Sequence, residues 1–328
     1  MIRRRVRCLA AACVFTWSWT APALAQDAAT YPERPVRIVV AFQAGSYSDI
    51  VARLLAERLG ASMRGSFVVE NRVGGGGTIG TEHVARSAPD GYALLFVSVA
   101  THGINPSLYA KLPYDAQKDF APVSLTMKVP NVAVVASSKL FQSLRELVAF
   151  AKANPGKLNY ASAGPGTSQH LTGELLKSLT GADIVHVPYK GSPSALADLL
   201  GGQVEVSFLN LPFVLQHVTR GDLRALAVTS ERRFPALPNV PTGAEAGVPG
   251  FVATSWSGMV APAATPPAIV RKLSAALQQV VRSPEMQRHF AENGAEAVGG
   301  TPEEFGAFIA EEISKWRVVV VKSGAKQD

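Results

Sequence analysis

Short apolar runs rich in β-branched residues alternate with amphipathic segments along most of the chain. Residues 36–42 (VRIVVAF) form a nearly continuous apolar run of strand length, typical of a parallel strand buried on both faces. Residues 49–63 follow and place apolar side chains on one helical face. These side chains are Ile50, Val51, Leu54, Leu55 and Leu59. The pattern predicts a strand–helix unit at the start of the fold.

The same alternation continues towards the C-terminus. We predict further strands at 67–70, 92–98, 131–136, 158–163, 183–189, 204–209 and 223–229. We predict further helices at 81–87, 144–154, 169–179, 193–201, 213–219, 267–282 and 302–321. Capping boxes at Ser143 and Thr301 mark two helix starts, and Ser192 is expected to cap a third. Repeated units of this kind indicate an α/β fold with mostly parallel sheets flanked by helices. Two such sheets would form two domains with a ligand cleft between them.

The first 25 residues read as a cleaved signal peptide. Four arginines (Arg3, Arg4, Arg5, Arg7) precede the short apolar run 9–17, and Ala23-Leu24-Ala25 matches a signal-peptidase site. The apolar run is shorter than the about 20 residues that a bilayer requires. We therefore expect export to the periplasm and a mature chain that starts at Gln26.

Removing that segment changes the charge and cysteine content. The full chain carries 32 Lys+Arg and 25 Asp+Glu, a formal charge of +7. Without the four arginines the mature chain has 28 basic residues against 25 acidic ones, a charge of +3. No basic cluster suggests nucleic-acid binding, whereas a mild positive excess suits a small anion. Cys8 and Cys13 are lost with the signal, so we expect no disulfide and no cysteine metal site.

Several motifs that would indicate an enzyme or a cofactor are incomplete. The glycine run at 75–80 matches GxGxxG, but the acidic residue expected about 20 positions later is missing. The six histidines show no HExxH spacing, so no metal site is expected. The segment 164–168 lacks the GxSxG elbow of serine hydrolases. We expect neither catalysis nor a bound nucleotide.

Two loops have the composition of an anion site. Residues 43–48 (QAGSYS) and 162–168 (SAGPGTS) are rich in small and hydroxyl residues, and each precedes a helix. Free N–H groups and the helix dipole favour negative charge at such a point. Ordinary helix capping by one Ser or Thr is the alternative. The matched pair favours binding, with Ser46 and Thr167 as expected hydroxyl donors to a carboxylate.

Over nearly the whole mature chain, the sequence resembles the Bug family, the periplasmic solute-binding subunits of tripartite tricarboxylate transporters. The resemblance lies in a series of segments that occur in the same order. The matching segments are YPERPVRIVVAFQAG, DIVAR, VVENRVGGGGTIG, APDGYALL, INPSLYAKLPYD, ANPGKLNYASAGPGTSQHLTGE, IVHVPYKG, RALAVTS and LPNVPTGAEAG. The resemblance implies a two-domain periplasmic binding protein fold of the second type, with domain 1 at 26–127 and 253–328 and domain 2 at 128–252. It also implies a monomer that binds a di- or tricarboxylate and contacts membrane transporter subunits transiently.

The resemblance further implies a set of ligand-binding residues. They are Phe42, Ala44, Gly45, Ser46, Tyr47, Asp49, Thr101, Asn105, Ser162, Ala163, Gly164, Gly166, Thr167, His170 and Asn210. Ser46 replaces a glycine of the family pattern, Tyr47 adds bulk, and Leu209 stands where many members carry an acid. These departures bear on which carboxylate binds. A ligand-presenting sensor and an exported carboxylate enzyme are the alternative functions.

Overall fold

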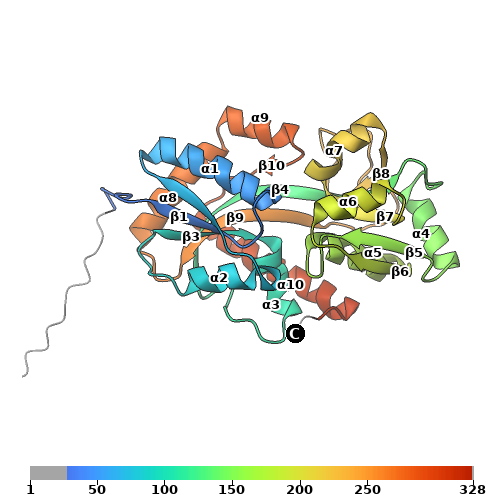
Figure 1. The fold of residues 1–328 in the computed structure, drawn as a ribbon, viewed down its shortest axis with the longest axis horizontal. Coiled ribbons are helices and arrows are strands. Elements are labelled where there is room, and N and C mark those ends of the chain that lie inside the picture. Colours follow the sequence, from blue (N-terminus) through green and yellow to red (C-terminus); the bar gives the residue numbers. More distant parts are fainter. Residues whose placement is uncertain (1–27, 327–328) are drawn as a thin grey trace, which may run out of the picture.

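The computed structural model describes residues 28–326 and, within them, joins ten strands in one sheet (Figure 1). The strands are β1 (Val36–Val40), β2 (Phe67–Asn71), β3 (Ala93–Ser98), β4 (Phe120–Ala136), β5 (Leu158–Ser162), β6 (Ile184–Pro188), β7 (Val206–Asn210), β8 (Leu223–Val228), β9 (Thr254–Pro262) and β10 (Glu296–Ala297). Their main order is β2-β1-β3-β9-β4-β7-β5-β6, while β8 and β10 pair with β4.

Helices connect and cover these strands. They are α1 (Tyr47–Met63), α2 (Thr78–Ala85), α3 (Asn105–Leu108), α4 (Leu144–Ala153), α5 (Ser168–Thr180), α6 (Ser192–Leu200), α7 (Leu211–Arg220), α8 (Pro267–Val281), α9 (Pro284–Glu292) and α10 (Pro302–Ser323). A short 3₁₀ turn, η1 (Gly75–Gly77), precedes α2, and a π-helical turn, η2 (Ala100–Ile104), precedes α3. None of the helices described is long and apolar enough to cross a membrane.

Parallel pairing, as predicted for strand–helix units, forms both ends of the sheet. Strand β1 pairs in parallel with β2 and β3, and β5 pairs in parallel with β6 and β7. Every residue of β3 is buried, because helices cover both faces of the sheet. We call the part built on β1–β3 with α1–α3 and α8–α10 the β1 lobe. The part built on β5–β8 with α4–α7 is the β5 lobe.

Antiparallel pairing occupies the middle of the sheet, which is therefore mixed rather than mostly parallel. The 17-residue strand β4 pairs with β9 along residues 120–130 and with β7 and β8 along residues 131–136. The sequence predicted only the second stretch. Pro122 and Pro130 interrupt the strand pattern of the first stretch, since proline is confined to strand edges and bulges. The β4–β9 register does shift next to Pro122. Strand β9 and helix α9 were not predicted.

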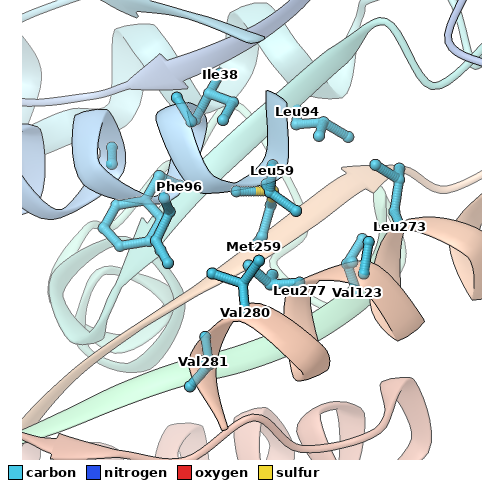
Figure 2. Packing of buried hydrophobic residues seen from close by; sticks show 14 of the residues in the cluster. Ile38, Leu59, Leu94, Phe96, Val123, Met259, Leu273, Leu277, Val280 and Val281 are labelled. Atoms are coloured by element: carbon cyan, nitrogen blue, oxygen red, sulfur yellow. The ribbon is translucent and has the colours of Figure 1, made fainter. Parts of the chain in front are cut away.

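Four hydrophobic clusters show how the helices are placed on the sheet. In the β1 lobe, one cluster joins α1 and α8 to one face, and a second joins α3 and α10 to the other. Figure 2 shows part of the first, where Leu59 of α1 and Leu277 of α8 meet Ile38, Phe96 and Met259 of the strands. In the β5 lobe, α4 and α5 cover one face, and α6 and α7 cover the other.

Helix starts follow the predicted local signals in most cases. Thr301 and Glu304 form the complete capping box predicted at α10. Ser143 caps α4, but the Glu146 carboxylate accepts from the N–H of Gln142, so this box is incomplete. Gly191, not Ser192, is the N-cap of α6. The predicted signal peptide lies outside the described residues.

Candidate functional site

The loop between β1 and α1 is organised by one buried carboxylate. Asp49 is 3% exposed. It accepts hydrogen bonds from the Gly45 N–H at 2.9 Å, Arg53 Nε at 3.0 Å and Asn71 Nδ2 at 2.9 Å. Burial acts to raise the pKa of Asp49, but these hydrogen bonds outweigh it and hold the pKa below its ordinary value. Asp49 therefore fixes the conformation of the loop through these hydrogen bonds. The positive φ of Gly45 (78°) lets the chain turn back onto the carboxylate.

The start of α1 offers donors in the first turn. The Ser46 hydroxyl accepts from the Asp49 N–H at 3.3 Å and caps the helix. The N–H groups of Tyr47 and Ser48 occupy the first two helical positions and have no intrahelical acceptor. Ala44 is exposed and Phe42 is partly buried, and the Phe42 carbonyl accepts from Asn71. This loop therefore offers first-turn backbone N–H groups together with the side-chain hydroxyls of Ser46 and Tyr47.

The loop between β5 and α5 is held together by its own hydrogen bonds. The Ser162 hydroxyl accepts from the Gly164 N–H at 3.1 Å and lies 2.7 Å from His186 Nε2. The Gly166 N–H donates to His170 Nδ1 at 3.2 Å. Because these groups bond within the loop, its shape is set before any ligand arrives.

The Thr167 hydroxyl makes two hydrogen bonds within its own loop. It donates to the Gly164 carbonyl at 2.7 Å and accepts from the His170 N–H at 3.3 Å. Its single proton is used in this arrangement, and its oxygen caps α5. The N–H groups of Ser168 and Gln169 fill the first two positions of α5 and have no intrahelical acceptor.

A buried amide network, which the sequence did not reveal, ties three loops of the β5 lobe together. Gln169 is 3% exposed; its Oε1 accepts from the Ala163 N–H at 2.8 Å, and its Nε2 donates to Ser192 Oγ at 2.8 Å. The same Nε2 donates to Asn210 Oδ1 at 3.3 Å, and Asn210 Nδ2 donates to Asn131 Oδ1 at 2.6 Å. Ser192 and Asn210 lie 23 and 41 residues from Gln169, so no local pattern marks them.

The loops of the two lobes meet directly. The Tyr47 ring of α1 lies 6.4 Å from the Phe213 ring of α7. A Cβ atom on Gly191 would lie 3.6 Å from Gln43 Nε2, across the same junction. A Cβ atom on Gly166 would lie only 2.5 Å from Leu108 of α3, and the φ of Gly166 is 73°. The close approach and the backbone conformation both require glycine at this position.

Two residues expected in the site, Thr101 and Asn105, are buried in the β1 lobe. Thr101 is 1% exposed; its hydroxyl accepts from the Ser98 N–H at 3.2 Å and lies 3.1 Å from His102 Nδ1. Asn105 is 2% exposed and donates to the Gly76 carbonyl at 3.1 Å, which holds the glycine turn. Asn105 also lies beside Gly166 of the other lobe. Asn105 thus lies at the junction, whereas the polar contacts of Thr101 stay within its own lobe.

Two histidines lie stacked behind the β5–α5 loop. The rings of His170 and His186 are 4.0 Å apart and inclined by 18°. Burial lowers the pKa of both to about 4, helped by Lys177 for His170 and by His170 for His186. Both rings are therefore neutral near pH 7. Within residues 28–326 no group of three or more His, Cys, Asp or Glu side chains could hold a metal ion.

Comparisons with known proteins agree on one family. The family model for the tripartite tricarboxylate transporter family receptor matches residues 51–325. The protein BugT of Bordetella pertussis is 42% identical over 301 residues, which cover 92% of each chain. This similarity confirms the resemblance to Bug proteins that the sequence segments indicated.

Solved structures confirm the expected fold class. R. palustris Rpa4515 with adipate has a TM-score of 0.84 at 37% identity, covering 90% of this chain and 99% of that one. MatC from Rhodopseudomonas palustris with bound malate has a TM-score of 0.81 at 33% identity, covering 88% and 100%. Both of these proteins were solved with a carboxylate. The two-lobed α/β arrangement described above is therefore shared with ligand-binding proteins.

Proposed function

The chain belongs to the tripartite tricarboxylate transporter receptor family, and from this premise we propose that it captures a small organic carboxylate for a transporter of this type. Members of this family are solute-binding proteins and not enzymes. The two ligand-bound relatives hold adipate and malate. A di- or tricarboxylate is the ligand class we assign to this chain.

The observation that carries the proposal is the pair of helix starts at the junction, one in each lobe. First-turn N–H groups of Tyr47 and Ser48, and of Ser168 and Gln169, are left without intrahelical acceptors. Hydrogen bonds to a charged group contribute about 1.5–3 kcal/mol each, and each helix dipole adds about 0.3–1 kcal/mol. Micromolar binding requires about 8 kcal/mol. Four such donors reach this value without an arginine.

The residues of the two loops divide into two roles under this proposal. The first-turn N–H groups of Tyr47, Ser48, Ser168 and Gln169 bind the ligand. The residues that line it without donating a free N–H are Phe42, Ala44, Gly45, Ser46, Ala163 and Gly164. Asp49, Ser162, Thr167, His170 and Asn210 hold the loops in shape. A surface pocket of about 630 Å³, lined by Lys128 and Arg232 among others, contains none of these residues. We assign the ligand to the loops, because each of them keeps first-turn N–H groups without an intrahelical acceptor.

We propose that the two lobes are the domains 26–127 with 253–328, and 128–252. Strands β4 and β9 are the two connections near these boundaries. Strand β4 pairs with β7 of the β5 lobe and with β9, which in turn pairs with β3 of the β1 lobe. Two connections allow a hinge motion that opens the junction to admit a ligand and closes on it. Contacts such as Tyr47 with Phe213 correspond to the closed form.

Proteins of this family are periplasmic, and we propose that residues 1–25 are the signal peptide that directs this chain there. Cleavage after Ala25 leaves a mature chain without cysteine, because Cys8 and Cys13 are its only two. We further propose a monomer that contacts membrane transporter subunits transiently. Mass spectrometry of periplasmic material should give a mature N-terminus at Gln26.

A carboxylate screen tests the function. Thermal shift with mono-, di- and tricarboxylates, followed by titration calorimetry, should find a ligand of micromolar or better affinity. A ligand at 100 times its dissociation constant should stabilise the protein by about 2.7 kcal/mol. Absence of saturable binding by any carboxylate in the correctly folded mature protein would contradict the proposal.

A further inference from the structure

The phenol oxygen of Tyr47 is buried and has no hydrogen-bond partner in the protein. Buried polar side chains in native proteins are almost always hydrogen-bonded, so an unpaired one requires an explanation. The neighbouring hydroxyl of Ser46 accepts the helix-capping hydrogen bond from the Asp49 N–H. Tyr47 therefore keeps a donor that the loop itself does not use.

The position of the ring places this donor at the junction of the lobes. Tyr47 is the first residue of α1, and its ring packs beside the core cluster between α1, α8 and the sheet. Its edge-to-face partner Phe213 belongs to the first turn of α7 and packs on a core cluster of the β5 lobe. Each ring is thus anchored in its own lobe, and the pair spans the junction beside the first-turn N–H groups of α1.

The chemistry of the phenol suits a ligand oxygen. Burial raises the pKa of Tyr47 well above its ordinary value, so the group stays protonated and neutral. A neutral O–H in a site shielded from water donates strongly to an anionic or carbonyl oxygen. It also adds no charge that would have to be neutralised when the ligand is absent.

We propose that Tyr47 is a specificity-determining residue, whose phenol donates to a second oxygen-bearing group of the bound carboxylate while its ring closes against Phe213. The inference rests on the proposed function and assigns to one residue the selection of carboxylates that carry a second oxygen acceptor. Ligands that lack this acceptor leave the phenol unpaired in the closed form. They should bind more weakly for that reason.

Matched ligands and a single-atom variant test the inference. Calorimetry compares adipate with hexanoate and succinate with butyrate, on the parent and on Tyr47→Phe. The parent should bind at least one of the two dicarboxylates about tenfold or more tightly than its monocarboxylate partner. In Tyr47→Phe that preference should fall about tenfold, and affinity for the monocarboxylates should stay within twofold.

A ligand-free measurement provides a second, independent readout. Tyr47→Phe should melt no lower than the parent, because the phenol loses no partner. Tyr31→Phe is the matched control, since the Tyr31 hydroxyl is buried and donates to the Gly91 carbonyl at 2.6 Å. It should lower the melting temperature and leave the preference for dicarboxylates intact.

The outcomes separate this inference from the proposed function. If the parent binds no carboxylate in the wider screen, both fail. If the parent binds carboxylates but shows no preference for the dicarboxylate of either pair, or Tyr47→Phe keeps the preference, only the role of Tyr47 is overturned. A marked loss of melting temperature in ligand-free Tyr47→Phe would also overturn it, because it would reveal a partner within the protein.

Discussion

His170 Nδ1 accepts a hydrogen bond from the Gly166 N–H at 3.2 Å, which ties the buried imidazole to the β5–α5 loop. A protonated ring would carry a hydrogen on Nδ1 and could not accept this bond. The titratable groups near the His170 ring are Lys177, His186 and Glu174. Lys177 disfavours protonation of His170, and His186 is stacked against it. Glu174 favours protonation of His186.

This geometry predicts a loss of stability in acid. The pKa of His170 is about 4 in the folded protein and about 6.5 when unfolded, so the unfolded state binds more protons between these values. The free energy of unfolding should therefore fall as pH drops from 6.5 towards 4, by about 3 kcal/mol for His170 alone. Urea unfolding at several pH values measures it.

The variant His170→Gln should flatten this dependence, and exposed His289→Gln is the matched control that should leave it unchanged. A parent protein equally stable at pH 7 and pH 4.5 would contradict the prediction.

Changing Gln169 to Leu should lower both the free energy of unfolding and the affinity for the ligand. The change leaves the Ala163 N–H and the Ser192 hydroxyl without their partner, which costs about 1–3 kcal/mol for a buried group. Chemical unfolding and calorimetry with the screened ligand measure the two effects. Gln203→Leu alters an exposed glutamine and should change neither. Equal stability of Gln169→Leu and the parent would show that the network contributes nothing.

The Asp49 carboxylate should contribute more to stability than its ion pair with Arg53 does. Asp49→Asn weakens the bonds from Gly45 and Arg53 and should cost about 1–3 kcal/mol of stability, together with ligand affinity. Arg53→Met removes only the partner whose side chain is 52% exposed and should cost less than about 1 kcal/mol. Calorimetric melting of both variants provides the comparison. Equal losses would assign the effect to the ion pair instead of the loop.

Thr167→Val should lower the stability of the ligand-free protein by about 1 kcal/mol, because the residue loses its cap on α5. Thr167→Ser keeps the hydroxyl and should melt close to the parent. If Thr167 acted only as a hydroxyl donor to a carboxylate, the change would affect binding and leave the ligand-free stability unaltered. Melting of the two variants without ligand decides between these expectations, since a pure ligand donor would leave both unchanged.

Local patterns were sufficient to predict most elements. The apolar run at β1, the capping box of Thr301 with Glu304 and the glycine after α5 each act within a few residues, so sequence reveals them. Strand β9 and the first part of β4 have no such local signature. Polar and proline residues interrupt them, and they become strands through their pairing with each other across more than a hundred residues.

The sequence by itself determined the α/β class, the family and the two loops that carry the candidate site. Those features follow from periodicity and from short glycine–hydroxyl segments. Only the tertiary structure decided which donors remain unused. Thr167 and Tyr47 both carry a hydroxyl beside a helix start, yet Thr167 bonds to Gly164 and the buried phenol of Tyr47 bonds to nothing. The bond of Thr167 spans only three residues, whereas the phenol of Tyr47 is buried by packing against residues distant in sequence, and only the tertiary structure shows that packing.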